Sequence, residues 1–209
     1  MIEATLIKVM VVDDHPLMRA GISSVVSSKS NMVVVAEAAN GIEAIENYKA
    51  HKPDVTLMDL RMEKIGGIDA IKAIRQLNPN ARIIVLTSAA GDIQARRALQ
   101  AGASAYLLKN LVRSELVETI QLVHAGHCHI PTEIASRMAE HSNDDSITPR
   151  ELDVLKGVAR GLSNKLIADD LGITEHTVKN NLKRILSKLD ARDRTHAVMI
   201  ALDRGFIER

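Results

Sequence analysis

The sequence predicts an α/β protein in which a doubly wound, five-stranded parallel sheet, (βα)5, precedes a small all-α unit. Five short apolar runs recur in the first part of the chain, and each is followed by a segment with apolar residues at helical spacing. Four of these runs end abruptly in polar or charged residues. The last part carries helical patterns alone. Strands that alternate with helices favour a parallel sheet, because each helix crosses over between two strands.

Local signals mark the ends of the expected elements. Proline tolerates the first helical turn, so Pro16 is expected to begin the first helix. Gly67 leads into the third helix and Pro79 follows its end. This helix has a clear apolar period: Ile68, Ile71, Ile74 and Leu77. The expected strands are residues 6–12, 32–35, 55–58, 82–86 and 105–108, and the expected helices are residues 16–27, 41–51, 67–77, 92–100 and 114–124.

Composition excludes several classes of protein. The chain has only two Tyr, one Phe and no Trp. With so few aromatic side chains, a stacking platform for single-stranded nucleic acid is not expected. The apolar runs are too short to span a membrane, and residues 1–8 lack a basic segment with a cleavage site, which predicts a cytoplasmic protein without membrane contact. A single cysteine, Cys128, excludes an intrachain disulfide. Residues 1–146 carry 15 basic and 17 acidic side chains, whereas residues 147–209 carry 12 and 9, so the C-terminal part favours a polyanion.

Polar side chains follow four of the expected strands. They are Asp13 and Asp14 after the first strand, Asp59 after the third, Thr87 after the fourth and Lys109 after the fifth. The carboxyl ends of parallel strands meet at one edge of the sheet, where such sheets bind ligands. Converging carboxylates repel one another unless a cation neutralises them, and hard oxygen ligands suit Mg²⁺. The predicted metal ligands are Asp13, Asp14, Asp59 and the backbone carbonyl of Arg61.

Asp59 is the expected nucleophile at this edge. A carboxylate can attack phosphorus, and a metal ion with Lys109 would stabilise the oxygens of the transferred group, with Thr87 completing the phosphate site. The plainer interpretation, that a strand-end aspartate only caps a turn, does not account for the other strand ends. A dehalogenase-type aspartyl-phosphate hydrolase would need a second aspartate two residues later. That position is Arg61, so we expect no enzyme of this kind.

Four segments resemble the receiver domain of bacterial two-component response regulators. They are residues 11–16 (VVDDHP), 57–62 (LMDLRM), 86–88 (LTS) and 105–109 (AYLLK), within a match over residues 6–125. The resemblance implies that Asp59 accepts a phosphoryl group from a sensor histidine kinase, and that Thr87 and Tyr106 change position in response. One departure is Glu63, where many receivers have proline, so the turn after Asp59 is expected to differ in shape.

Residues 126–146 are interpreted as a connection between residues 1–125 and residues 147–209. Three histidines and Cys128 lie close together at residues 124–129, but their spacing matches no standard zinc pattern, so a connector is favoured over a metal site. A short helix is expected over residues 131–140. Residues 141–146 are small and polar, as in a flexible linker.

The C-terminal part predicts a helix-turn-helix. Thr148 and Glu151 form a capping box with Pro149 at the first helical position. A second helix is expected to begin after Ser163 and to end at residues 171–172, and a third begins after Thr174. The third helix has a buried stripe (Val178, Leu182, Ile185 and Leu189) and an opposite polar face (His176, Lys179, Asn180, Lys183 and Arg184). Charged residues on a helix more often form a solvated surface. Here the polar face follows the turn and its charges are all positive, which favours a DNA-binding face.

This part resembles the DNA-binding domain of the LuxR/FixJ/NarL group in residues 161–165 (GLSNK), 167–168 (IA), 171–173 (LGI) and 177–180 (TVKN). The resemblance implies that Lys179, Asn180 and Lys183 approach base edges in the major groove. Phosphate contacts are expected from Thr177, Arg184 and Lys188. It also implies a dimerisation helix over residues 195–204. Leu166 and Asn181 depart from the residues common in the group, which could shift the sequence preference.

Together the resemblances predict a phosphorylation-gated transcriptional regulator of the NarL type. The expected partners are double-stranded promoter DNA with a near-palindromic site, a sensor histidine kinase, RNA polymerase and a second copy of the chain. The alternative is a DNA-binding regulator controlled by dimerisation or a ligand without phosphorylation. The acidic pair Asp13 and Asp14, together with Thr87 and Lys109, argues against that alternative.

Overall fold

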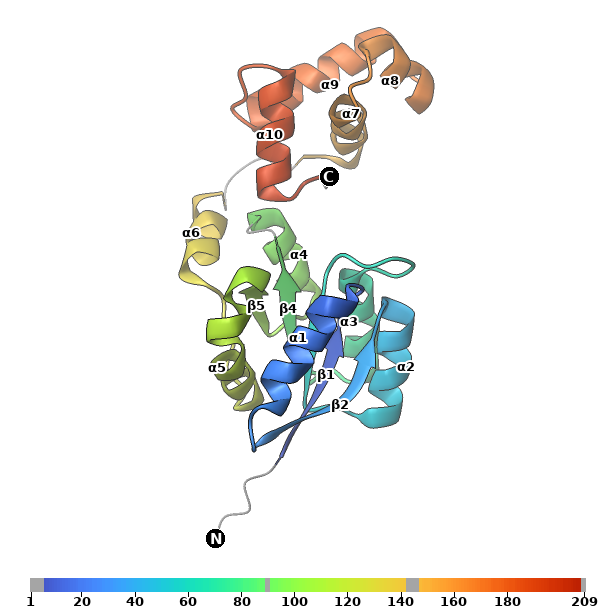
Figure 1. Cartoon of the computed structure of the whole chain (residues 1–209). Coiled ribbons are helices and arrows are strands. Elements are labelled where there is room, and N and C mark those ends of the chain that lie inside the picture. Colours follow the sequence, from blue (N-terminus) through green and yellow to red (C-terminus); the bar gives the residue numbers. More distant parts are fainter. Residues whose placement is uncertain (1–5, 89–90, 142–146, 208–209) are drawn as a thin grey trace. The chain divides into compact units, whose positions relative to one another are not determined.

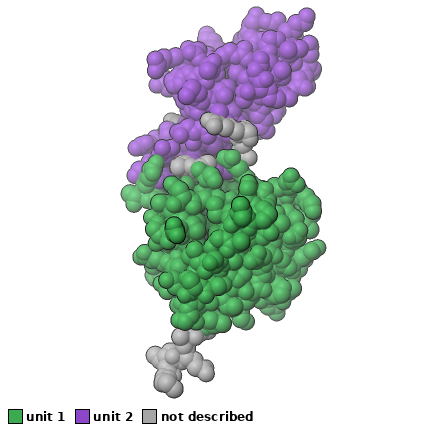
Figure 2. Space-filling model, viewed as in Figure 1, with its two compact units in different colours: residues 1–88, 95–133 green, residues 89–94, 134–209 purple. Residues whose placement is uncertain are grey.

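The computed structural model describes residues 6–88, 91–141 and 147–207, which belong to two compact units. The first unit comprises residues 1–88 and 95–133, and the second comprises residues 89–94 and 134–209 (Figure 2). Residues 142–146 of the expected flexible linker lie outside the described residues. No helix in the described part of the chain combines the length and the apolar character needed to cross a lipid bilayer.

The first unit is built on five parallel strands in the order β2-β1-β3-β4-β5, which confirms the predicted fold class (Figure 1). The strands are β1 (Ile7–Val12), β2 (Met32–Ala38), β3 (Val55–Asp59), β4 (Ile83–Thr87) and β5 (Ala105–Leu108). The helices are α1 (Pro16–Ser27), α2 (Gly41–His51), α3 (Gly67–Leu77), α4 (Asp92–Ala101) and α5 (Val112–His124), the last preceded by a short 3₁₀ turn, η1 (Lys109–Leu111).

Alternate residues of the strands face opposite sides of the sheet, and both sides are buried. One side packs against α1 and α5 in a single apolar cluster. That cluster includes Val9, Val11, Leu57, Ile84 and Leu107 from the strands, and Ile22, Val26, Leu116 and Ile120 from the two helices. Burial on both sides explains why the strands are continuous apolar runs.

Two expectations about individual elements need correction. The stripe of α3 was expected to include Leu77, but that side chain is 48% exposed. The buried face of α3 instead contains two small residues beside its isoleucines: Gly67, Ala70, Ile71 and Ile74. Strand β2 continues to Ala38 rather than ending at residue 35, because its pairing with β1 extends to the partners Val12 and Ala38.

The described residues of the second unit include the start of α4 and five further helices. These are α6 (Thr132–Glu140), α7 (Pro149–Ala159), α8 (Asn164–Leu171), α9 (Glu175–Lys188) and α10 (Arg194–Arg204). Helices α8 and α9 are joined at Gly172, whose positive φ of 62° favours glycine. The predicted capping box of α7 is confirmed, with Thr148 and Glu151 hydrogen-bonded to each other's backbone. The core of this unit includes Val154, Leu155, Ile167, Val178, Ile185, Leu189, Ala197 and Ala201. These contacts fix α9 against α7 and α8.

Candidate functional site

The register of the sheet brings the polar strand ends together. Val12 of β1 pairs with Met58 of β3, so the next residues, Asp13 and Asp59, lie side by side. The chain runs from β1 outward to β2 and then returns to β3 on the other side, so this pair lies where the strand order reverses. Open α/β sheets bind ligands at such a switch point. The predicted convergence of strand ends is therefore present.

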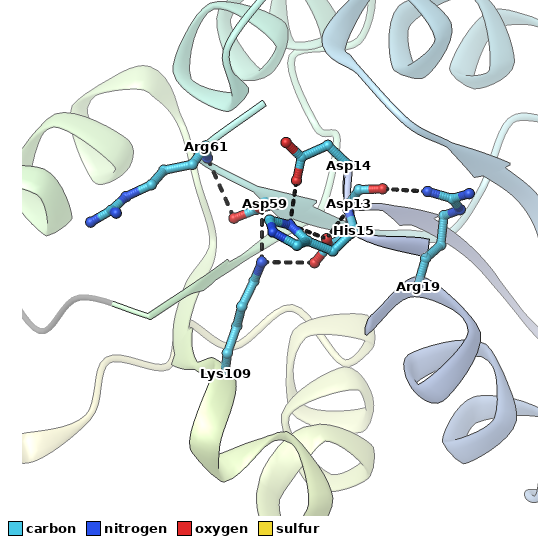
Figure 3. A network of polar contacts seen from close by, with 7 residues as sticks. All are labelled: Asp13, Asp14, His15, Arg19, Asp59, Arg61 and Lys109. Atoms are coloured by element: carbon cyan, nitrogen blue, oxygen red, sulfur yellow. Dashed lines mark hydrogen bonds and ion pairs between the residues drawn. The ribbon is translucent and has the colours of Figure 1, made fainter. Parts of the chain in front are cut away.

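Lys109 joins the two buried carboxylates. Its Nζ lies 2.8 Å from Oδ2 of Asp59, to which it donates a hydrogen bond, and 2.8 Å from Oδ2 of Asp13 (Figure 3). Asp13 and Asp59 are almost fully buried. One ammonium group therefore serves two carboxylates in a poorly hydrated place, which leaves a net negative charge on these three side chains.

Burial determines the ionisation of this pair. It raises the pKa of Asp59 above its usual value, because Lys109 and the backbone N–H of Arg61 only partly offset the lost hydration. Burial lowers the pKa of Lys109, but its hydrogen bonds and attraction to Asp13 and Asp59 outweigh this effect, so the pKa of Lys109 is raised overall. Lys109 is therefore held in its charged form, but its positive charge does not fully compensate the buried carboxylate of Asp59.

Asp14 and His15 form the outer side of the site. Asp14 is partly exposed, and Nδ1 of His15 lies 2.7 Å from its Oδ1. The backbone N–H of His15 donates to Oδ1 of Asp13 at 2.9 Å, while Arg19 of α1 donates to the backbone carbonyl of Asp13 at 2.6 Å. The bonds made by the His15 N–H and by Arg19 fix the turn that presents both acidic residues.

The potential ligand atoms of Asp13, Asp14, His15 and Asp59 all lie within 4.8 Å of one another, and among the described residues this is the group of side chains that could hold a metal ion. Three carboxylates with a deficit of positive charge fit a hard divalent cation such as Mg²⁺. The histidines and cysteine at residues 124–129 form no comparable group. Instead, the backbone of His129 pairs with Ala105 of β5.

The turn after Asp59 is held close to β3 by Gly67. A Cβ atom at this position would come within 2.1 Å of the backbone oxygen of Asp59, so no side chain fits without a shift of the backbone. The N–H of Gly67 donates to the carbonyl of Leu60 at 3.1 Å, and the N–H of Arg61 donates to Oδ1 of Asp59 at 3.4 Å. The carbonyl of Arg61 as a metal ligand stays a prediction.

Thr87 and Tyr106 share a side-chain hydrogen bond on the neighbouring strands β4 and β5. Both side chains are buried, with Thr87 at the end of its strand, where Leu108 pairs with it and Lys109 follows. Burial raises the pKa of Tyr106 to about 12, although the bond with Thr87 lowers it. The phenol therefore stays protonated and connects the end of β4 to β5.

Helix α9 carries the predicted DNA-binding side chains in the second unit. Its exposed residues include His176, Lys179, Asn180, Lys183 and Arg184, and Thr177 is partly buried. Lys179 pairs with Glu175 one turn earlier at 3.0 Å, and the hydroxyl of Thr177 lies 2.9 Å from that of Thr174, the cap of the helix. The cationic face is therefore presented to solvent by a helix whose start is well defined.

Lys188 and Asn181 differ from the other polar residues of α9. Nζ of Lys188 lies 2.9 Å from Oε2 of Glu151 in α7, and both side chains are largely buried. Asn181 is also buried, and its side chain donates to the carbonyl of Thr177 at 2.8 Å. Sequence reasoning gave Glu151 only the role of a cap and gave no role to His15 or Arg19. The capping pattern predicts the role of Glu151 at the start of α7, but no local pattern predicts its contact with Lys188, 37 residues away.

Comparisons with known proteins match both units. Residues 9–121 match the family described as "Response regulator receiver domain". Residues 145–201 match the family described as "Bacterial regulatory proteins, luxR family". The two matches follow one another in the order that the sequence predicted.

Similar proteins cover nearly the whole chain. The response regulator protein VraR of Staphylococcus saprophyticus is 37% identical over 207 residues, which are 97% of this chain and 99% of that protein. The uncharacterized transcriptional regulatory protein YhcZ of Bacillus subtilis is 41% identical over 204 residues, 93% of this chain and 95% of that protein. A crystal structure of the response regulator ChrA, of a heme-sensing two-component system, is 32% identical with a TM-score of 0.58 and covers 97% of this chain and 100% of that one.

Proposed function

We propose a phosphorylation-gated switch for this chain, which belongs to the DNA-binding response regulators of the luxR family and is therefore a transcriptional regulator. In this proposal residues 1–125 form the receiver, residues 126–146 connect it to the rest of the chain, and residues 147–209 bind DNA. Asp59 accepts the phosphoryl group from a sensor histidine kinase. The observation that carries the proposal is the convergence of Asp13, Asp59 and Lys109 at the edge of the sheet.

The transfer needs a nucleophile and positive charge around it. An oxygen of Asp59 forms a bond to phosphorus while the bond from phosphorus to the donor's nitrogen breaks, so the phosphoryl group moves without oxidation or reduction. A Mg²⁺ ion held by Asp13, Asp14 and Asp59 would supply charge to the oxygens of the transferred group. Lys109, which directly follows β5, adds a second positive charge, and the burial that raises the pKa of Asp59 fits this need.

The output of the switch begins at Thr87. A phosphoryl group on Asp59 offers oxygens to the Thr87 hydroxyl, and its shift changes the hydrogen bond with Tyr106. We propose that the new arrangement favours a dimer through α10, in which two α9 helices contact two half-sites about 10 base pairs apart on near-palindromic DNA. Lys179, Asn180 and Lys183 would contact bases, and the bound dimer would act on RNA polymerase at the promoter.

The full chain can be tested with beryllofluoride, which mimics the phosphoryl group on an aspartate. Duplexes selected from a random-sequence pool by the chain serve as the DNA. With Mg²⁺ and beryllofluoride we expect dimers in light scattering and DNA affinity about 5- to 150-fold higher, the usual range for such coupling. The Asp59→Asn variant should show neither change. Equal DNA affinity and mass with and without beryllofluoride would instead favour regulation by a ligand or by dimerisation alone.

A further inference from the structure

His15 places an imidazole nitrogen among the three carboxylates of the acceptor site. Its Nδ1 lies 2.7 Å from Oδ1 of Asp14 and 3.6 Å from Oδ1 of Asp13 (Figure 3). The ligand atoms of this residue and of the three aspartates lie within 4.8 Å of one another. The proposed function uses the carboxylates and leaves this nitrogen without a role.

The ring is not needed to build the surrounding structure. His15 is the cap residue of α1, but its side chain makes no capping hydrogen bond to the helix, which begins with Pro16. The backbone N–H of His15 makes the bond to Asp13, so the turn does not depend on the ring. The side chain is 73% exposed and can adjust its position.

The position of Nδ1 suits a shared metal ion. Adjacent ligands of an octahedral ion with bonds of about 2.1 Å lie about 3 Å apart. The distances from Nδ1 to the oxygens of Asp14 and Asp13 bracket this value. Nδ1 of His15 and Oδ1 of Asp14 share a hydrogen bond, so the nitrogen already lies beside the oxygen that would bind the ion.

We propose that Nδ1 of His15 is a metal ligand of the acceptor site, which gives this site a preference for divalent transition metals such as Mn²⁺ over Mg²⁺. Imidazole suits transition metals, whereas Mg²⁺ prefers oxygen ligands alone. The inference rests on the proposed function, because it assumes that the cation is bound by Asp13, Asp14 and Asp59. It adds the identity of the metal that this site selects.

Manganese alone, added to the full chain, tests the ligand directly. Mn²⁺ is paramagnetic, and electron spin echo experiments detect a ¹⁴N nucleus bonded to it. We expect a ¹⁴N signal from the unmodified chain and from the His51→Ala variant, whose histidine lies at the end of α2. The signal should be lost in His15→Ala. A bound Mn²⁺ ion without a ¹⁴N signal, or a signal that persists in His15→Ala, would overturn the proposal.

Competition between the two ions measures the preference. We expect His15→Ala to weaken Mn²⁺ binding roughly tenfold and Mg²⁺ binding by much less, as followed by the free Mn²⁺ signal during Mg²⁺ titration. His15→Asp, which keeps an oxygen ligand, should also lose the preference while it retains Mg²⁺. An equal loss for both ions would mean that His15 only positions Asp14 and would overturn the proposal. Failure of the unmodified chain to bind either ion at Asp13, Asp14 and Asp59 would instead contradict the metal site of the proposed function.

Discussion

Lys188, in the last turn of α9, lies 2.9 Å from Glu151 at the start of α7, and this pair joins the proposed DNA-reading helix to the helix that opens the domain. The same Glu151 oxygen accepts hydrogen bonds from the backbone N–H and the hydroxyl of Thr148. Burial raises the pKa of Glu151, but Lys188 and Thr148 lower it more, so the pKa ends below its usual value. The carboxylate therefore remains charged and binds both partners near neutral pH.

The Glu151→Gln variant tests the contribution of this charge to stability. We expect it to lower the free energy of unfolding by about 2 to 4 kcal/mol at pH 7, because Lys188 loses its counter-ion in a largely buried place. A carboxylate with a lowered pKa stabilises the folded state above its usual pKa and loses this effect as the pH falls through its folded value. The difference between the two proteins should therefore shrink below a pH of about 4.5.

Hydrogen exchange of peptides from residues 147–207 can measure this difference in the full chain. Glu175→Gln is a matched control, because its ion pair with Lys179 is exposed and is expected to contribute less than about 1 kcal/mol. Equal protection in the Glu151→Gln variant and the unmodified chain at pH 7 would show that the pair does not stabilise the domain.

The hydrogen bond between Tyr106 and Thr87 is expected to carry the signal away from Asp59. Tyr106→Phe keeps the buried ring and removes the hydroxyl, so it should cost about 1 kcal/mol of stability. Phosphorylation of Asp59 should continue in this variant, but the gain in DNA affinity should be smaller. Intact mass and DNA titration measure the two effects separately.

Tyr48→Phe is a matched control for this variant. Its hydroxyl accepts a hydrogen bond from Asn78 at 2.9 Å, in a part of the sheet unit away from the acceptor site. We expect Tyr48→Phe to keep the full gain in DNA affinity on phosphorylation. If Tyr106→Phe also kept it, another route from Asp59 would have to carry the signal.

Asn180 is expected to contact a base edge, whereas the exposed Arg184 is expected to contact phosphate alone. Asn180→Ala should cost roughly 1 to 3 kcal/mol at one base position and relax the preference there. Arg184→Ala should weaken all sequences alike and lower the salt dependence by about one counter-ion. Binding titrations at several salt concentrations, with matched and mutated duplexes, separate these effects.

Lys156 on α7 is also exposed and cationic, so Lys156→Ala controls for general charge. It should leave base preference unchanged. An Asn180→Ala variant with the same affinity and base preference as the unmodified chain would show that this face of α9 is only solvated surface.

Much of the fold could be predicted because its signals are local. The alternation of apolar runs and helical periods predicted the sheet, and Thr148 with Glu151 predicted the start of α7. The errors came from packing, which has no local pattern. Leu77 has the correct spacing for the buried face of α3 but lies in the last turn of the helix, where the core no longer covers it.

The candidate site could be predicted in outline for the same reason. Each strand carries its own polar end, and parallel pairing alone brings Asp13, Asp59 and Lys109 together. The close approach of Gly67 to Asp59, and the contact of Lys188 with Glu151, depend on how segments far apart in sequence meet. For this reason the sequence predicted an exposed phosphate contact for Lys188 and did not predict its buried ion pair with Glu151.

Intact-mass analysis after incubation with Mg²⁺ and acetyl phosphate tests most directly whether Asp59 accepts the phosphoryl group. We expect the chain to gain one acid-labile phosphoryl group, to lose this gain in Asp59→Asn, and to keep it in Asp54→Asn, whose carboxylate precedes the same strand and accepts a hydrogen bond from the backbone of Lys8. Removal of Mg²⁺ should abolish labelling, because the buried carboxylates then lack the charge that the transfer requires. Labelling that persisted unchanged in Asp59→Asn, or that needed no Mg²⁺, would contradict the account.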